Sequence, residues 1–214
     1  GGDGGLLPEA IDASRLLLIP GQRADVLVTP SDAAGSIQFL RWIPFDRGLG
    51  SAELRAPELV LRLEFVDEAG EPVAPTLTRT IAPIDVAGAT PVELRLTEMK
   101  DAEGHPLLGI NGVPFGEGEP FPATVGETQV WTIDNQTDWS HPFHLHGFFF
   151  QEIDEDGAAV EPIAWLDSID VPAHELRRIA VHFDERPGMW MFHCHILDHA
   201  EAGMMAMVDL REPP

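Results

Sequence analysis

Short apolar runs, separated by Gly and Pro turns, recur along the whole chain. The runs that we expect to form strands are RLLLI, ADVLV, SIQFL, ELVLRLEFV, VELRL, TQVWTI, FHLHGFFFQEI, LRRIAVHF and GMWMFHCHI. This spacing is typical of β-sandwiches and differs from that of helix bundles or βαβ units. Only ILDHAEAG, the segment after His195, has a brief helical pattern. The sequence therefore predicts an all-β protein.

The distribution of these runs divides the chain into two parts. Residues 67–90 are rich in Pro, Ala, Gly and Thr, a composition that predicts a linker. Residues 91–214 contain enough runs for one complete β-sandwich. Residues 1–66 contain only about four runs, fewer than the roughly seven strands of a closed sandwich. We therefore expect a partial second sandwich at the N-terminus.

Charge and composition exclude several classes of partner. The 214 residues include 13 basic and 36 acidic ones, which gives a net charge of −23. Such a surface repels nucleic acid and anionic lipid and attracts cations. The longest apolar runs are too short to span a bilayer. We therefore expect no nucleic-acid partner and no membrane insertion.

Two histidine-rich motifs carry the candidate chemistry. HCHILDHAEAGM runs from His193 to Met204 and contains the only cysteine of the chain, Cys194, between two histidines. HPFHLHG begins at His141. One thiolate, several imidazoles and one thioether are the ligand set of a blue copper site with further metal beside it.

Strand alternation predicts that each motif divides its ligands between two faces, because successive side chains point in opposite directions. One face collects a thiolate, two imidazoles and a weak axial thioether, the type 1 copper set, from His141, Cys194, His199 and Met204. The opposite face collects imidazoles only, which suit copper that binds oxygen, from His144, His146, His193 and His195. The peptide bonds on either side of Cys194 would join the two centres.

Other residues near the motifs have plainer interpretations. Zinc also binds Cys and His, but it rarely recruits methionine. We expect surface or hydrogen-bonded roles for His105, His174 and His182, and core packing for Met189, Met191, Met205 and Met207. Asp167 is either a carboxylate that orients a ligating histidine or a turn residue.

Both motifs resemble those of the multicopper oxidases, the laccase and cuprous oxidase superfamily. The family patterns HPxHLHG and HCHxxxHxxxGM match His141–Gly147 and His193–Met204, and weaker matches are DGGLL, LIPGQRADVLV and INGVPF. The resemblance implies a Greek-key, cupredoxin-like sandwich over residues 91–214 and half of a middle cupredoxin domain over residues 1–66. It also implies a periplasmic or extracellular location.

The resemblance further implies roles for the individual residues. Type 1 copper would be held by His141, Cys194, His199 and Met204. His144 would be a type 2 ligand, and the type 3 pair would be held by His146, His193 and His195. The complete enzyme would hold four coppers, and Cys194 with its two neighbours would carry electrons between the centres.

The chain departs from the family pattern in two ways. The two other family motifs, each an HxH pair, are absent. We therefore expect an N-terminal segment or a separate chain to supply them. Some bacterial members also carry a glutamate after the second type 1 histidine for proton delivery, whereas this chain has Ala200, followed by Glu201.

The function that these motifs predict is laccase-like. It is one-electron oxidation of phenols or aromatic amines, coupled to four-electron reduction of O2 to water. An alternative substrate is Cu(I) or another metal ion, which the acidic surface would suit. A cupredoxin electron carrier has no use for the imidazoles on the second face. A copper nitrite reductase lacks the HCH arrangement.

Overall fold

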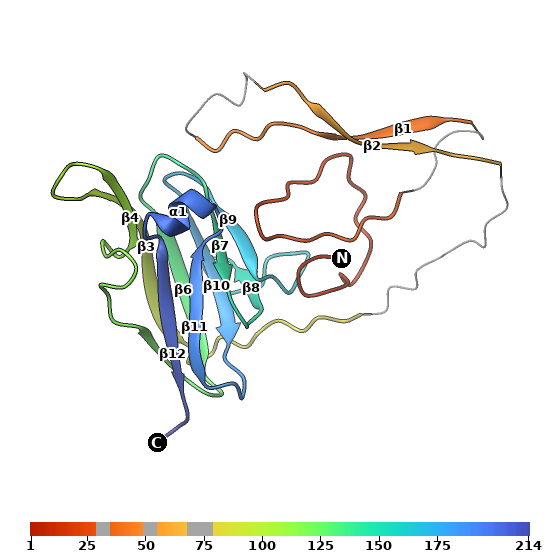
Figure 1. Cartoon of the computed structure of the whole chain (residues 1–214). Helices are drawn as coiled ribbons and strands as arrows, with labels where there is room; N and C mark the ends of the chain where they lie inside the picture. Colours follow the sequence, from red (N-terminus) through yellow and green to blue (C-terminus); the bar gives the residue numbers. More distant parts are fainter. Residues whose placement is uncertain (29–34, 49–54, 68–78) are drawn as a thin grey trace. The chain divides into compact units, whose positions relative to one another are not determined.

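The computed structural model describes residues 1–28, 35–48, 55–67 and 79–214 (Figure 1). The chain forms two compact units, Gly1–Asp25 with Leu77–Pro214, and Val26–Thr76. The number of strand-like runs had grouped residues 1–25 with residues 26–66. Their polar contacts instead reach the C-terminal part, where Gly4 donates its N–H to the Trp165 carbonyl at 2.9 Å. Residues 68–78 of the predicted linker lie outside the described residues.

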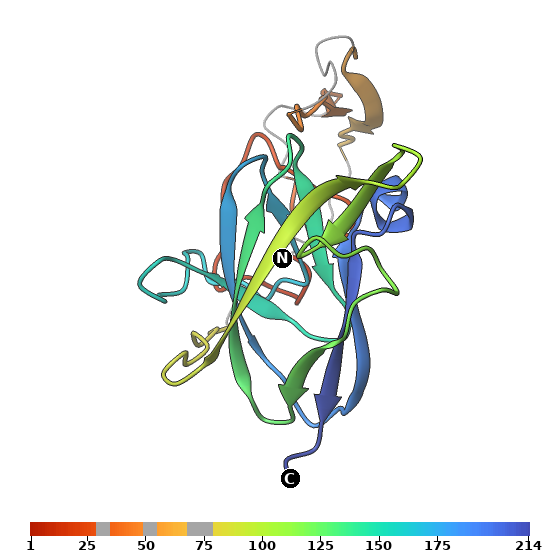
Figure 2. The ribbon, with the colours of Figure 1, turned by 90° about the vertical axis from the view of Figure 1, so that its left-hand side faces the viewer.

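Two five-stranded sheets form the larger unit, and Figure 2 shows them as facing layers. The strands of the first sheet, in spatial order, are β4 (Pro106–Ile110), β3 (Thr90–Lys100), β6 (Thr128–Asn135), β10 (Leu176–His182) and β8 (Phe150–Ile153). Those of the second are β5 (Phe121–Thr124), β12 (Met205–Arg211), β11 (Gly188–Cys194), β7 (His141–Leu145) and β9 (Ser168–Val171). One short helix, α1 (Leu197–Glu201), connects β11 to β12.

The chain crosses repeatedly between these sheets, so that neighbours in a sheet are seldom consecutive in sequence. Most neighbours are antiparallel, but β3 pairs with β6 and β12 with β5 in parallel. The all-β, cupredoxin-like sandwich that the sequence predicted is confirmed. The only helix among the described residues, α1, has five residues. It is therefore too short to cross a bilayer.

The core lies between the two sheets and reaches the candidate ligands. Burial alternates along β6, as expected for a strand with one face on a core. Trp131 of β6 is fully buried and meets the ring edges of Phe192 and Phe143, with centroids 5.0 and 6.1 Å away. Because these phenylalanines precede His193 and His144, core packing fixes the backbone that presents both histidines.

The smaller unit contains the antiparallel pair β1 (Ile37–Trp42) and β2 (Glu58–Glu64). Large apolar residues of both strands are exposed in the described structure, among them Phe39, Leu40, Leu59 and Val60. Two strands alone cannot enclose a core. This exposure agrees with the partial sandwich expected for the N-terminal part.

The observed strands differ from the expected ones in two ways: some expected runs form no strand, and some observed strands were not expected. RLLLI and ADVLV form no strand, and Leu16, Leu17 and Leu18 are exposed, because no neighbouring strand in the described residues pairs with them. The run FHLHGFFFQEI divides into β7 and β8 around Gly147, whose φ of 79° ends the first strand. The strands that the pattern did not reveal are β4, β5, β9 and β12.

Candidate metal centre

The two histidine motifs meet because β7 and β11 are antiparallel neighbours. His193 lies opposite His144, and Cys194 lies opposite Phe143. In this register Cys194 and Phe143 face the core, while His193 and His144 face outward and are half-buried. The alternation expected from the sequence therefore produces two separate groups of side chains.

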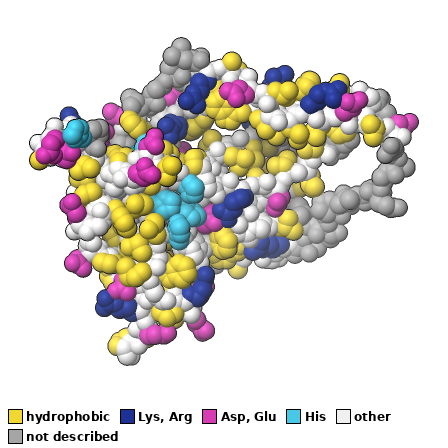
Figure 3. All heavy atoms as spheres, in the orientation of Figure 1, with side chains coloured by type: hydrophobic (Ala, Val, Ile, Leu, Met, Phe, Trp, Pro, Cys, Tyr) yellow, Lys and Arg dark blue, Asp and Glu magenta, His cyan; other side chains and the backbone are white. Residues whose placement is uncertain are grey.

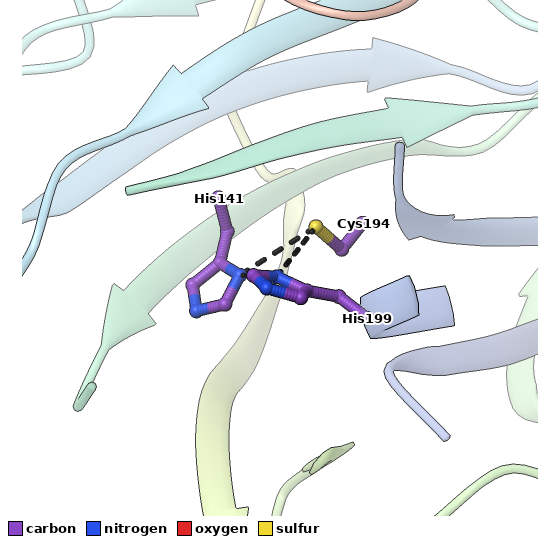
Figure 4. Close-up of side chains that lie close together, drawn as sticks. All are labelled: His141, Cys194 and His199. Atoms are coloured by element: carbon purple, nitrogen blue, oxygen red, sulfur yellow. Dashed lines mark hydrogen bonds between the residues drawn. The ribbon is translucent and has the colours of Figure 1, made fainter. Parts of the chain in front are cut away.

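The inward group consists of His141, Cys194 and His199, all buried (Figure 4). The Cys194 Sγ lies 3.5 Å from His141 Nδ1 and 3.6 Å from His199 Nδ1, and the two Nδ1 atoms are 3.0 Å apart. One sulfur and two imidazole nitrogens converge on one point, a donor set that fits copper. His141 comes from the start of β7 and His199 from α1, so this point lies where the strand and the helix meet.

Hydrogen bonds determine which nitrogen of His141 carries its proton. The Thr137 hydroxyl can donate to Asn135 Oδ1, at 2.9 Å, or to the Trp139 carbonyl, at 3.3 Å. Thr137 Oγ1 therefore accepts from His141 Nε2, 2.7 Å away. The proton on Nε2 leaves a lone pair on Nδ1, the atom directed at Cys194.

Met204 belongs to the same buried region. It has no exposed surface and packs in the core cluster that contains Cys194. Its carbonyl accepts a hydrogen bond from the Cys194 N–H, and its own N–H donates to the His199 carbonyl, both at 3.0 Å. Three of the four predicted type 1 residues are thus joined through backbone hydrogen bonds, in an apolar setting that excludes water.

The outward group consists of His144, His146 and His193, whose ligand nitrogens lie within 4.8 Å of one another. The Nε2 atoms of His146 and His193 are 3.0 Å apart. The His195 ring packs against those of His144 and His193, with centroids 5.2 and 5.4 Å away, but its nitrogens fall outside that close group. Histidine side chains gather on the molecular surface, with apolar side chains beside them (Figure 3).

Carbonyl acceptors fix the tautomers of two outward histidines. His193 Nδ1 lies 2.8 Å from the Cys194 carbonyl, and His144 Nδ1 lies 2.9 Å from the Asp167 carbonyl. Because a carbonyl only accepts, both Nδ1 atoms carry protons, and both Nε2 atoms offer lone pairs to the centre of the group. Burial lowers the pKa of His193, the hydrogen bond to the Cys194 carbonyl partly opposes this, and nearby imidazoles, His146 first among them, lower it further. The neutral form that binds metal is therefore favoured.

A carboxylate network supports His144 from outside the group. Arg23 donates to both oxygens of Asp167, at 2.8 and 2.6 Å, and Asp167 Oδ1 lies 3.5 Å from His144 Nδ1. Burial alone would raise the pKa of Asp167. Hydrogen bonds from His144, Arg23 and Ser168 together hold that pKa well below its usual range, so this carboxylate is charged.

Sequence reasoning considered Asp167 but missed Arg23, Asp3 and Thr137. Asp3 and Arg23 stand in DGGLL and LIPGQRADVLV, the segments noted for their resemblance to the family, which was the available signal. Thr137 precedes the HPFHLHG motif by four positions and had no recognisable pattern of its own.

The histidines outside the two motifs have the surface roles that the sequence predicted. The three other histidines are exposed and bonded to nearby polar groups, His105 to Asp101, His174 to Asp138 and His182 to Thr128.

The expectation of core packing for four methionines was wrong, since Met189 is exposed and Met191, Met205 and Met207 are half-buried. Their strands place them on the outward face, in register with His193. At the proton-delivery position Ala200 is buried, and Glu201 is exposed to solvent.

Known proteins with similar sequences include copper proteins. A family model described as multicopper oxidase matches residues 85–213. The chain is 28% identical to a laccase of Bacillus subtilis over 100% of its own length and 46% of that protein. Copper resistance protein A of Escherichia coli is 36% identical over 48% of this chain and 16% of that protein.

Solved structures extend the likeness to the fold. A laccase from Pediococcus acidilactici matches with a TM-score of 0.78 and 32% identity, over 98% of this chain and 44% of that one. The chain thus spans less than half the length of the laccases it matches.

Proposed function

Because this chain belongs to the multicopper oxidase family, we propose that it forms the C-terminal part of a laccase-like enzyme. The reaction is the oxidation of four molecules of a phenol or aromatic amine, one electron from each, coupled to the reduction of O2 to two molecules of water. Copper, when bound, supplies the one-electron acceptor beside Cys194 and the centre of O2 reduction beside His144, His146, His193 and His195.

One observation carries this proposal. The strands β7 and β11 contribute ligands to the inward group from one face and to the outward group from the other, and α1 adds His199 to the inward group. Adjacent residues of β11, Cys194 and His193, belong one to each group. A carrier of single electrons needs only the inward group. The second group, one peptide bond away, is explained by a function that passes electrons onward to an acceptor.

Different side chains orient the ligands, exclude water and connect the two groups. Thr137 keeps the His141 Nδ1 lone pair directed at the inward site, and the apolar core around Cys194 excludes water and limits rearrangement during electron transfer. The His193 imidazole is tied to the Cys194 carbonyl, so a hydrogen bond runs beside the covalent path. His146 and His193 present their Nε2 atoms to each other at the outer face.

The outward group also suggests a partner. His146 and His195 are exposed, and the apolar side chains beside this group are incompletely covered in this chain. A polypeptide segment bearing two HxH pairs would supply four further imidazoles and cover this face. The active enzyme is then this chain together with that segment.

Oxygen uptake by the complete, copper-loaded protein tests the proposal. We expect four molecules of a one-electron phenolic donor to be oxidised per O2, without release of hydrogen peroxide. Cys194→Ser should remove the intense visible absorption and the uptake together, because a hydroxyl does not replace the soft thiolate. A Cys194→Ser protein that stays blue, or a wild type that oxidises donors only with nitrite under anaerobic conditions, contradicts the proposal.

A metal-ion oxidase is the second candidate. It is favoured by the net charge of −23, which attracts cations, and by the similarity to a copper resistance protein. Values of kcat/KM for Cu(I) and for a phenol, measured at the same ionic strength, separate the two candidates. A much higher value for Cu(I), which falls as salt rises, would favour the metal ion.

A further inference from the structure

The turn at Pro20–Arg23 lies against the outward histidines. A Cβ placed on Gly21 would stand 2.6 Å from His195 Cδ2 and 3.0 Å from Ser168 Oγ, and Gly21 has a φ of 88°. Both observations require glycine here. The backbone of this turn therefore packs against His195 and Ser168 and leaves no room for a side chain at position 21.

Arg23 fixes this turn and reaches beyond it. Its Nη1 donates to the Gly21 carbonyl at 2.8 Å and also to Asp167 Oδ1, while Nη2 donates to Asp167 Oδ2. Asp3, whose side chain is fully buried, accepts from the N–H groups of Arg23, at 2.8 Å, and Asp167, at 3.2 Å. Asp167 is thus held at its carboxylate and at its backbone.

A directional relay leads from Asp167 to His144. The Ser168 hydroxyl donates to Asp167 Oδ1 at 2.9 Å, which leaves Ser168 Oγ as an acceptor for His144 Nδ1–H at 3.0 Å. Ser168 also lies directly opposite His144 in the β7–β9 pair. The His144 Nδ1–H is therefore shared between Ser168 Oγ and the Asp167 carbonyl, 2.9 Å away, and both acceptors depend on how Asp167 is held. The orientation of the His144 ring, and the direction of its Nε2 lone pair, follow from the position of Asp167.

We propose that Arg23 is a positioning residue for the oxygen-reducing centre, acting through Asp167 and Ser168 on the type 2 copper ligand His144. This rests on the proposed function. The bidentate geometry is the reason that arginine stands here, because a planar guanidinium fixes both carboxylate oxygens and an ammonium fixes one. The N-terminal segment, residues 1–25, thereby contributes to a site whose histidines come from β7 and β11.

The test uses the complete, copper-loaded protein and the electron paramagnetic resonance signal of type 2 copper. Arg23→Met should change the hyperfine splitting of that signal and weaken retention of this copper against a chelator about 10–100-fold, the usual cost of losing an outer partner of a ligand. Type 1 absorption should not change. Arg23→Lys should fall between Arg23→Met and the wild type.

Arg79→Met is the matched control. Arg79 holds the same N-terminal segment through the Gly4 carbonyl, at 2.7 Å, but has no bond to Asp167 or His144 in the described structure. It should leave the type 2 signal unchanged. Ser168→Ala breaks the relay while preserving the Arg23–Asp167 pair, so it should reproduce the spectral change even if Arg23→Met does not fold.

Two results would overturn the inference. One is an unchanged type 2 signal in Arg23→Lys and Ser168→Ala. The other is an equal change in Arg79→Met, which would mean that Arg23 only fastens the segment. A wild-type protein without any type 2 signal would refute the proposed function itself, which is a separate outcome.

Discussion

His193 donates a hydrogen bond from Nδ1 to the carbonyl of Cys194, the residue that follows it, at 2.8 Å. This closes a small ring between a side chain of the outward group and the backbone of the inward group. It holds the His193 imidazole at one angle to the strand and leaves Nε2 directed at His146.

His193→Ala should therefore separate the two halves of the proposed reaction. The blue absorption should persist, because the inward donor atoms remain. The rate of oxygen uptake with a phenolic donor should fall by more than about 100-fold. Loss of a residue that only supports a metal ligand usually lowers activity roughly 10–100-fold, and here the ligand itself is removed. Visible spectra and an oxygen electrode measure both effects, and normal uptake would remove His193 from the oxygen-reducing centre.

Thr137→Val should weaken the inward site without touching a ligand. Valine has the shape of threonine but accepts no hydrogen bond, so the buried His141 Nε2–H loses its partner at a cost of about 1–3 kcal/mol. The free energy of unfolding should fall by that amount, and copper should bind more weakly. Thr137→Ser, which keeps the hydroxyl, is the control, and equal losses in both variants would exclude the hydrogen bond as the cause.

Met204→Leu should tune the inward site while preserving it. An axial thioether is a long, weak ligand that alters the reduction potential. We expect the blue colour to remain and the potential to rise, as measured by redox titration of the visible band. Loss of copper from this variant would show that Met204 is needed to hold the metal.

Trp131→Ala tests how the core supports both sites. The indole is fully buried, touches Phe143 and Phe192, and donates from Nε1 to Gln129 Oε1 at 2.8 Å. Its removal should lower stability by about 3–5 kcal/mol. Thermal unfolding of the metal-free protein measures this loss, and Trp131→Phe should recover part of it. A loss below 1 kcal/mol would mean that the core collapses around the gap.

The strand pattern and the two motifs predicted the sandwich and placed Cys194 and His193 on opposite faces, because alternation is a local property of strands. The edges of the sheets were harder to predict. β5 and β9, each of four residues, carry too few apolar positions to show a period of two.

The supports of the site depend on contacts between distant parts of the chain. Arg23 and Asp167 lie 144 positions apart, so no local pattern predicts their pairing. RLLLI has the composition of a strand, but the described residues provide it with no neighbour. Local sequence pattern therefore predicts which residues can act as ligands, whereas the residues that orient these ligands are known only from the tertiary structure.

The register of β7 against β11 also has a consequence for biogenesis. A slip of one residue would turn every side chain of β11 to the other face and exchange Cys194 with its histidine neighbours. The pairing of β7 with β11 therefore decides which face each strand ligand occupies, while His199 joins the inward group from α1. Until that event, the nascent chain presents one thiol and scattered imidazoles without geometric preference among metals. The geometry that selects copper is thus expected to arise only on folding, so metal affinity and folding stability should be coupled.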